Sequence, residues 1–137
     1  MGAVLRSAEA AGVAGVIVSN GSADAFSSKS LRASMGSAFR IPIWSSESFD
    51  RVLSWGAEQG LVATAVGASA GVSYSKTDLR VPRLLVFGSE AHGIEVEELD
   101  QMNDRIRIEM CSGVESLNLA VAAGIVLFEA RRQNTGV

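Results

Sequence analysis

The amino-acid sequence predicts an α/β fold, a parallel sheet covered by helices on both faces. Helix-like and strand-like segments alternate along the whole chain, which is typical of parallel strands joined by helices. One segment, Leu84–Phe87, is a fully apolar run between Pro82 and Gly88, as expected of a strand buried on both faces. With 47% hydrophobic and 20% charged residues, residues 1–137 are expected to form one compact domain.

The N-terminal elements are predicted from helix formers and turn formers. Residues Ala3–Ala11 favour a helix that ends at Gly12, and Gly15–Ser19 favours a strand. Turn-forming residues then lead to a helix predicted at Ser30–Phe39, which must end before Pro42 because proline disfavours helix in the residue before it.

The middle of the chain continues the alternation. A short strand is expected at Ile41–Trp44, and Ser45 and Ser46 are good N-caps for an amphipathic helix that runs to Gln59 before Gly60. The remaining expected elements are, in order, a strand, the apolar strand described above, a helix, a strand and a long helix, at Leu61–Val66, Leu84–Phe87, Glu95–Asp100, Arg105–Met110 and Ser116–Arg132.

Composition excludes several functional classes. The net charge of −3 gives no overall attraction to nucleic acid, so any RNA contact must be local. The chain has one cysteine, Cys111, and one histidine, His92, which excludes an internal disulfide, makes a protein metal site improbable and fits a reducing cytoplasm. The apolar stretch Leu117–Phe128 is too short to span a bilayer and indicates a buried helix.

The first segment suited to chemistry is GSEAHG, Gly88–Gly93, where the apolar strand ends. Ligands of parallel sheets bind beyond the carboxyl ends of the strands, and glycines there let the backbone approach a ligand closely. A simple structural turn explains the pattern equally well. It matches neither the dinucleotide fingerprint, whose middle glycine is missing, nor a Walker loop, whose lysine is missing.

The second segment begins at the strand Arg105–Met110 and continues as CSGVESLN into an apolar helix. Ser116 suits an N-cap, so a capping role and a functional role both stay open. Asn118 is less easily explained, since an amide between Leu117 and Leu119 lowers helix propensity.

Taken together, in this order and spacing, the two segments resemble motifs of the SpoU/TrmH family of RNA 2′-O-ribose methyltransferases, in the SPOUT superfamily. The family pattern is a strand, then G-[NS]-E-x-x-G, then I-P-M, then S-L-N with an apolar helix. This chain reads LVFGSEAHGI, IEM and ESLNLAVAAGIVLFEA. The N-terminal GAVLRSAEAAG and RASMGSAFRIP are similar to the family's first motif and the segment after it, so the resemblance covers essentially the whole chain.

The sequence departs from the family at two places. The asparagine that opens the first motif would precede Met1, so the domain is expected to lack its extreme N-terminal strand as well as a separate RNA-recognition domain. Glu109 stands where the family has proline, and we expect its side chain to point to solvent rather than into an adenine pocket.

The resemblance implies a parallel α/β domain with a C-terminal trefoil knot, one of the rare exceptions to the rule against knots, and a homodimer. It also implies S-adenosyl-L-methionine as the methyl donor, with no metal. The donor would be held by backbone groups of Gly88, Ile108 and Leu117. The apolar residues near Met110 and Leu117 would enclose its adenine.

The same resemblance implies four catalytic positions. Arg6 matches the residue proposed as the base that accepts the 2′-hydroxyl proton, although a guanidinium is a permanent cation and is better suited to anchoring a phosphate. Glu90 would orient Arg6 or a loop amide, Ser116 would hydrogen-bond the donor or the ribose, and Asn118 would fix the loop geometry. His92 falls at a variable position and is expected to be a surface residue.

The implied substrate is tRNA or rRNA. Lys29, Arg32 and Arg40 are candidates for phosphate contacts beside Arg6, or form an ordinary solvated face. Trp44 and Trp55 are expected in the core or a dimer contact. The main alternative is a disabled SPOUT-like module that dimerises or binds RNA without catalysis; an NAD-dependent oxidoreductase is disfavoured by the broken glycine fingerprint.

Overall fold

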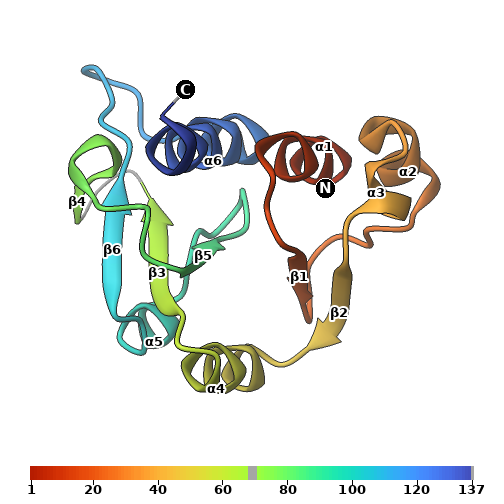
Figure 1. Cartoon of the computed structure of the whole chain (residues 1–137), viewed down its shortest axis with the longest axis horizontal. Coiled ribbons are helices and arrows are strands. Elements are labelled where there is room, and N and C mark those ends of the chain that lie inside the picture. Colours follow the sequence, from red (N-terminus) through yellow and green to blue (C-terminus); the bar gives the residue numbers. More distant parts are fainter. Residues whose placement is uncertain (68–70, 137) are drawn as a thin grey trace.

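A computed structural model describes residues 1–67 and 71–136 of the chain. Two parallel sheets run through the molecule (Figure 1). The smaller sheet pairs β1 (Val16–Ser19) with β2 (Ile43–Glu47). The larger has the order β4-β6-β3-β5, formed by Val72–Ser73, Asp104–Arg107, Val62–Gly67 and Arg83–Phe87. Every pairing between these strands is parallel, which confirms the predicted fold class.

Helices cover the sheets on two sides. Figure 1 shows α1 and α6 side by side above the strands, with α4 and α5 below. The helices, in chain order, are α1, α2, α3, α4, α5 and α6, at Gly2–Ala11, Ser28–Ser34, Ser37–Arg40, Phe49–Glu58, Val96–Leu99 and Leu119–Thr135. A 3-10 turn, η1, covers Tyr74–Lys76. Within residues 1–67 and 71–136, no helix has the length and apolar character needed to cross a membrane.

The apolar core has two centres. One lies between the larger sheet and α6, around Val66, Ile106 and Val126. The other lies where α1 packs against the smaller sheet, around Leu5 and Val18. Because α1 also packs along α6, the two centres belong to one layered body.

The first helix follows the prediction closely. It ends at Gly12, which adopts the left-handed conformation (φ 79°) and whose N–H donates to the carbonyl of Glu9 at 3.0 Å. Glycine occupies this conformation without the steric cost that a Cβ brings, so Gly12 stops the helix.

The single helix predicted at Ser30–Phe39 is wrong, because the structure has two short helices there. Met35 takes a left-handed conformation (φ 51°) that ends α2, and Gly36 begins α3. The inner side of this bend carries the small buried residues Ser34, Ser37 and Ala38, which let the chain turn closely against α1.

The predicted N-caps Ser45 and Ser46 are also wrong. Both lie in β2, and the cap of α4 is Ser48, whose side chain accepts a hydrogen bond from the N–H of Arg51. Pairing with β1, in which Val18 faces Ser45, extends the strand past the first two serines. The strand β5 differs as well: it lies at one edge of the larger sheet and all its residues are half-buried rather than fully buried.

Candidate functional site

The two segments that the sequence singled out leave the larger sheet at the same place, the carboxyl ends of its parallel strands. β5 and β6 both run parallel to β3, one on either side of it. The turn Gly88–Gly93 follows the end of β5, and the segment from Ile108 to Asn118 follows the end of β6. Carboxyl ends of parallel strands are where α/β proteins bind ligands.

The Gly88–Gly93 turn is closed by its own hydrogen bonds. The backbones of Ser89 and Gly93 bond each other twice, at 2.8 and 3.3 Å, and the Ser89 hydroxyl accepts from the N–H of His92 at 3.0 Å. A Cβ on Gly88 would stand 2.1 Å from the carbonyl carbon of Gly93, so only glycine fits there. Glu90 is exposed and forms no side-chain hydrogen bond with any residue the structure describes.

The segment after β6 begins inside the core. Ile108 is buried, and its N–H donates to the carbonyl of Gly67 at 3.1 Å. Met110 and Leu117 are half-buried and pack against the same apolar cluster as Phe87, the last residue of β5. The two predicted segments are therefore joined through one cluster of side chains at the edge of the sheet.

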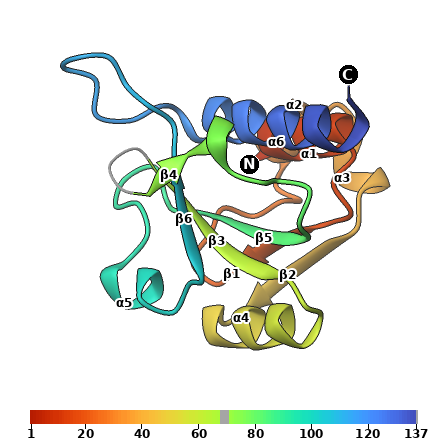
Figure 2. The same cartoon turned by 60° about the vertical axis from the view of Figure 1, so that its left-hand side comes forward.

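Between Met110 and Leu117 the chain forms an exposed loop. Residues 111–116 are all exposed, and Figure 2 shows this part of the chain projecting beyond the sheet. The loop contains a turn at Gly113 (φ 86°), with the N–H of Val114 bonded to the carbonyl of Cys111 at 3.3 Å. Ser116 belongs to this exposed loop and does not cap α6, which settles one alternative left open by the sequence.

Asn118 is the N-cap of α6. Its side-chain oxygen accepts hydrogen bonds from the N–H groups of Ala120, at 2.9 Å, and Val121, at 3.3 Å. A helix start leaves such N–H groups without partners, and an asparagine side chain satisfies them well. Asn118 thus fixes the point at which the exposed loop becomes helix.

Arg6 lies on the exposed side of α1. α1 runs beside α6, with Ser7 close to Gly124: the Ser7 hydroxyl oxygen would be 3.9 Å from a Cβ placed there. Within the described part of the chain, no hydrogen bond or ion pair joins Arg6 to Glu90, Ser116 or Asn118. Within the described residues, one copy of the chain brings the two motif segments together on one apolar cluster and joins Arg6 to neither of them by a hydrogen bond or ion pair.

The predicted phosphate contacts differ in availability. Lys29 and Arg32 are exposed on α2 and take part in no ion pair among residues 1–67 and 71–136. The guanidinium of Arg40 already has partners within the protein. Its Nε lies 2.8 Å from a carboxylate oxygen of Glu9, and its Nη2 donates to the carbonyl of Met35 at 3.2 Å.

Glu109, which replaces the family's proline, is exposed, as predicted. A hydrogen bond from Ser73 lowers the pKa of its carboxyl group, with smaller contributions from its own backbone and from the nearby cations Arg107 and Lys76. The carboxylate therefore stays charged and is associated with residues of β4, η1 and β6.

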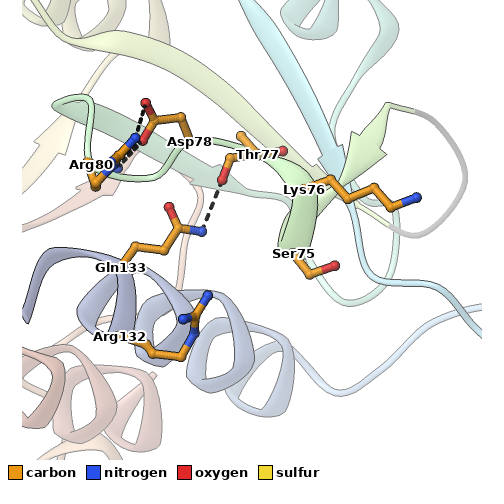
Figure 3. A pocket seen from close by; sticks show the side chains of 7 residues that line it. All are labelled: Ser75, Lys76, Thr77, Asp78, Arg80, Arg132 and Gln133. Atoms are coloured by element: carbon orange, nitrogen blue, oxygen red, sulfur yellow. Dashed lines mark hydrogen bonds and ion pairs between the residues drawn. The ribbon is translucent and has the colours of Figure 1, made fainter. Parts of the chain in front are cut away.

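A cavity of about 370 Å³ lies away from the two motif segments, between the chain around η1 and the end of α6. Figure 3 shows its lining side chains bonded within the protein: Asp78 pairs with Arg80 at 2.9 Å, and Gln133 donates to the carbonyl of Thr77 at 3.0 Å. None of the predicted site residues lines this cavity. In the described ranges, no three His, Cys, Asp or Glu side chains are arranged to hold a metal.

The sequences of known proteins are similar to this chain along almost its whole length. The sequence profile described as the SpoU rRNA Methylase family matches residues 1–128. The 23S rRNA (guanosine-2′-O-)-methyltransferase RlmB of Xylella fastidiosa is 37% identical over 135 residues, 98% of this chain and 54% of that protein. An uncharacterized tRNA/rRNA methyltransferase of Synechocystis sp. is 35% identical over 97% of this chain and 48% of its own length.

Solved structures of methyltransferases have the same fold as this chain. The SpoU methyltransferase AviRb of Streptomyces viridochromogenes, in complex with its cofactor AdoMet, superposes with a TM-score of 0.93 at 30% identity, over 99% of this chain and 56% of that one. An AdoMet-bound rRNA methyltransferase of Sinorhizobium meliloti gives a TM-score of 0.88 at 38% identity, over 96% of this chain and 50% of its own.

Fold and motif segments together define an α/β methyltransferase-type domain. The chain belongs to the SpoU rRNA methylase family. It spans about half the length of the relatives reported above.

Proposed function

We propose that this chain is the catalytic domain of an S-adenosylmethionine-dependent methyltransferase acting on a ribose 2′-hydroxyl of tRNA or rRNA. The observation that carries the proposal is the meeting of Phe87, Met110 and Leu117 on one apolar cluster, at the sheet edge where such folds bind ligands. Relatives with AdoMet bound and relatives named as 2′-O-methyltransferases support it.

The residues at this edge fit the proposed donor. An adenine ring needs apolar contacts on its faces, and Met110 and Leu117 offer half-buried apolar side chains. The space that a side chain of Gly88 would need is filled by the backbone of Gly93, so Gly88 can offer the donor only its backbone groups. The N–H of Ile108 is already bonded to Gly67, so the carbonyl of Ile108 is the group left for the donor, together with backbone groups of Gly88 and Leu117.

Four side chains are assigned to the reaction. When bound, the donor supplies an electrophilic methyl group on sulfonium sulfur. Arg6 either anchors the target phosphate or serves as the base that takes the 2′-hydroxyl proton, and anchoring is favoured because a guanidinium is a permanent cation with donors only. Glu90 orients Arg6 or a loop amide, Ser116 bonds the donor or ribose, and Asn118 holds the loop entrance.

The proposal includes a homodimer and the family's trefoil knot, in a cytoplasmic protein. Two apolar side chains of α6, Val121 and Phe128, are seven residues apart on one side of the helix and are exposed. A second copy covering this side would bury them. Lys29 and Arg32 are assigned to RNA phosphates, with Arg40 contributing less because its charge is shared with Glu9.

Two measurements test the function. Calorimetry with S-adenosylhomocysteine is expected to show binding, and mass mapping of ribose methylation in tRNA and rRNA is expected to show transfer. Arg6→Ala should abolish transfer and leave donor affinity unchanged, whereas the control Arg131→Ala, another exposed cation on the adjacent helix, should keep both. Full activity of Arg6→Ala would remove this residue from the mechanism. Donor binding without transfer to any RNA would favour the alternative, a disabled module that dimerises or binds RNA.

A further inference from the structure

The surface formed by α2 and α3 exposes large apolar side chains. Phe39 is 75% exposed and Met35 is 65% exposed, although water solvates such groups poorly. Both belong to the short stretch that bends from α2 into α3. We call the exposed surface of residues 28–40 the α2–α3 face.

The fold holds these side chains outward. Ser37 and Ala38 are buried, and α3 packs against α1, so the interior side of this short helix accepts only small residues. Arg40 fixes the same stretch from outside by bonding Glu9 on α1 and the carbonyl of Met35. The phenyl ring of Phe39 is therefore presented on a supported backbone rather than on a long loop.

The stretch that forms the α2–α3 face carries three basic residues, Lys29, Arg32 and Arg40, and no acidic one. The first 46 residues contain four basic residues and two acidic ones, whereas the rest of the chain contains eight basic and thirteen acidic. Of the two acids, Glu9 is paired with Arg40, and Asp24 accepts a hydrogen bond from the N–H of Phe26. Lys29 and Arg32 therefore give this face a local positive charge suited to a polyanion.

The two tryptophans, in contrast, already pack against other side chains. Trp44 and Trp55 are half-buried and pack edge to face with their centroids 5.6 Å apart, and Arg51 lies 6.0 Å from the Trp44 ring. On the basic part of the molecule, Phe39 is the most exposed of the large apolar side chains.

An exposed ring on the same surface as cations that form no ion pair within residues 1–67 and 71–136 suits single-stranded RNA, in which bases stack on aromatic side chains while Lys and Arg contact phosphates. We propose that the α2–α3 face binds an unpaired stretch of the substrate RNA, with Phe39 stacking on a base and Lys29 and Arg32 contacting adjacent phosphates. This inference rests on the proposed function, whose substrate it narrows to RNA with an unpaired region.

The position of the face determines its role. In Figure 1, α2 and α3 lie at the end of the molecule opposite β6 and the loop that follows it. Within one protomer, the base stacked on Phe39 is therefore not the nucleotide that is methylated. The face anchors a flanking part of the RNA, which affects binding and not the chemical step.

The test measures binding of a fluorescently labelled oligouridine to the whole chain at several salt concentrations. Phe39→Ala should weaken binding roughly tenfold, and Phe39→Tyr, which keeps a stacking surface, should retain most of it. Lys29→Ala and Arg32→Ala should each lower the slope of log K against log salt by about 0.7. Val96→Ala, which truncates an exposed apolar residue on the acidic helix α5, serves as the control and should change nothing. With an unmethylated RNA that the protein is found to methylate, Phe39→Ala should raise KM and leave kcat unchanged.

Three results would overturn the inference: no binding of oligouridine by the intact protein, equal binding by Phe39→Ala, or a change of oligomeric state in Phe39→Ala by sedimentation, which would make the face a contact between copies. Donor binding by calorimetry and methyl transfer are measured on the same proteins. Failure of the inference with donor binding and transfer intact leaves the proposed function standing, whereas absence of donor binding and transfer rejects the proposed function.

Discussion

The two motif segments at the edge of the larger sheet are built in different ways. The Gly88–Gly93 turn is closed by its own backbone bonds and by a close approach that admits only glycine. The loop 111–116 is exposed and is held mainly at its ends, by Met110 and Leu117 in the core and by the cap at Asn118. One segment is preformed, while the other has its ends fixed and its middle free to adapt to a ligand.

The two segments follow strands that Arg83 links at their amino-terminal ends, and removing this link has the largest expected effect. Arg83, whose side chain is only 10% exposed, donates to Thr64 at 2.8 Å and to Asp104 at 2.7 Å, and so ties together β5, β3 and β6. Arg83→Met should lower the free energy of unfolding by about 2 kcal/mol, because Thr64 and the partly exposed Asp104 lose their partner.

Chemical denaturation measures this effect, and Arg80→Met is the matched control. Arg80 pairs with Asp78 at the surface, where an ion pair contributes at most about 1 kcal/mol. Equal losses in the two variants would show that the strands do not depend on the Arg83 link.

The preformed turn should tolerate substitution less well than the loop. Gly88→Ala places a methyl group against the backbone of Gly93 and should cost roughly 1–3 kcal/mol, with a large loss of donor affinity. Gly113→Ala in the loop meets no atom within 4 Å, and its left-handed backbone alone should cost about 1 kcal/mol. Thermal unfolding and calorimetry with S-adenosylhomocysteine compare them; a loop variant as damaging as the turn variant contradicts the distinction.

Asn118 allows the anchoring of the loop to be separated from chemistry. Asn118→Ala should cost about 1 kcal/mol through loss of the cap, and Asn118→Asp should restore stability because aspartate caps equally well. Methyl transfer measured on both variants then distinguishes the roles. Restored stability with restored transfer would mean that Asn118 acts only as a cap.

The smallest effect is expected at the opposite end of α6. A hydrogen bond from Arg132, with a second from Gln133, lowers the pKa of Glu129 to about 2 from its ordinary value of 4.5. Because the folded-state pKa is the lower one, this contribution to stability is present above about pH 4.5 and is lost as the pH falls toward 2. The unfolding midpoint of Glu129→Gln should therefore depend less on pH over this range than that of the unaltered protein. Parallel pH profiles would rule out the contribution.

Much of this architecture could be predicted from sequence because its signals are local. Glycines and apolar runs located the turn at Gly88 and the strands on either side of it, and a Ser-Leu-Asn sequence before an apolar run located the entrance to α6. Local signals failed where a tertiary contact decides. The bend at Met35 depends on packing against α1, and the choice of Ser48 over two earlier serines depends on strand pairing.

Contacts between distant parts of the chain gave no sequence signal at all. The two-residue strand β4 has no periodicity to detect. Gln133, which accepts from the N–H of Leu79 at 2.7 Å, joins residues 54 positions apart, and nothing in the local sequence distinguishes it from a surface glutamine. For the candidate site, the sequence identified the two segments that meet on one apolar cluster. It did not indicate that, within the described residues, Arg6 forms no hydrogen bond or ion pair with either segment.

The packing of α1 along α6 also orders events during synthesis. These helices stand near opposite ends of the sequence, yet each supplies the surface on which the other is buried. On the ribosome, α1 emerges long before α6, and the side of α1 that packs along α6 stays uncovered until the last helix has been made. A contact between segments so far apart in the sequence slows folding. Until α6 has been made, Leu5 on the other side of α1 is covered by α2, α3 and the smaller sheet.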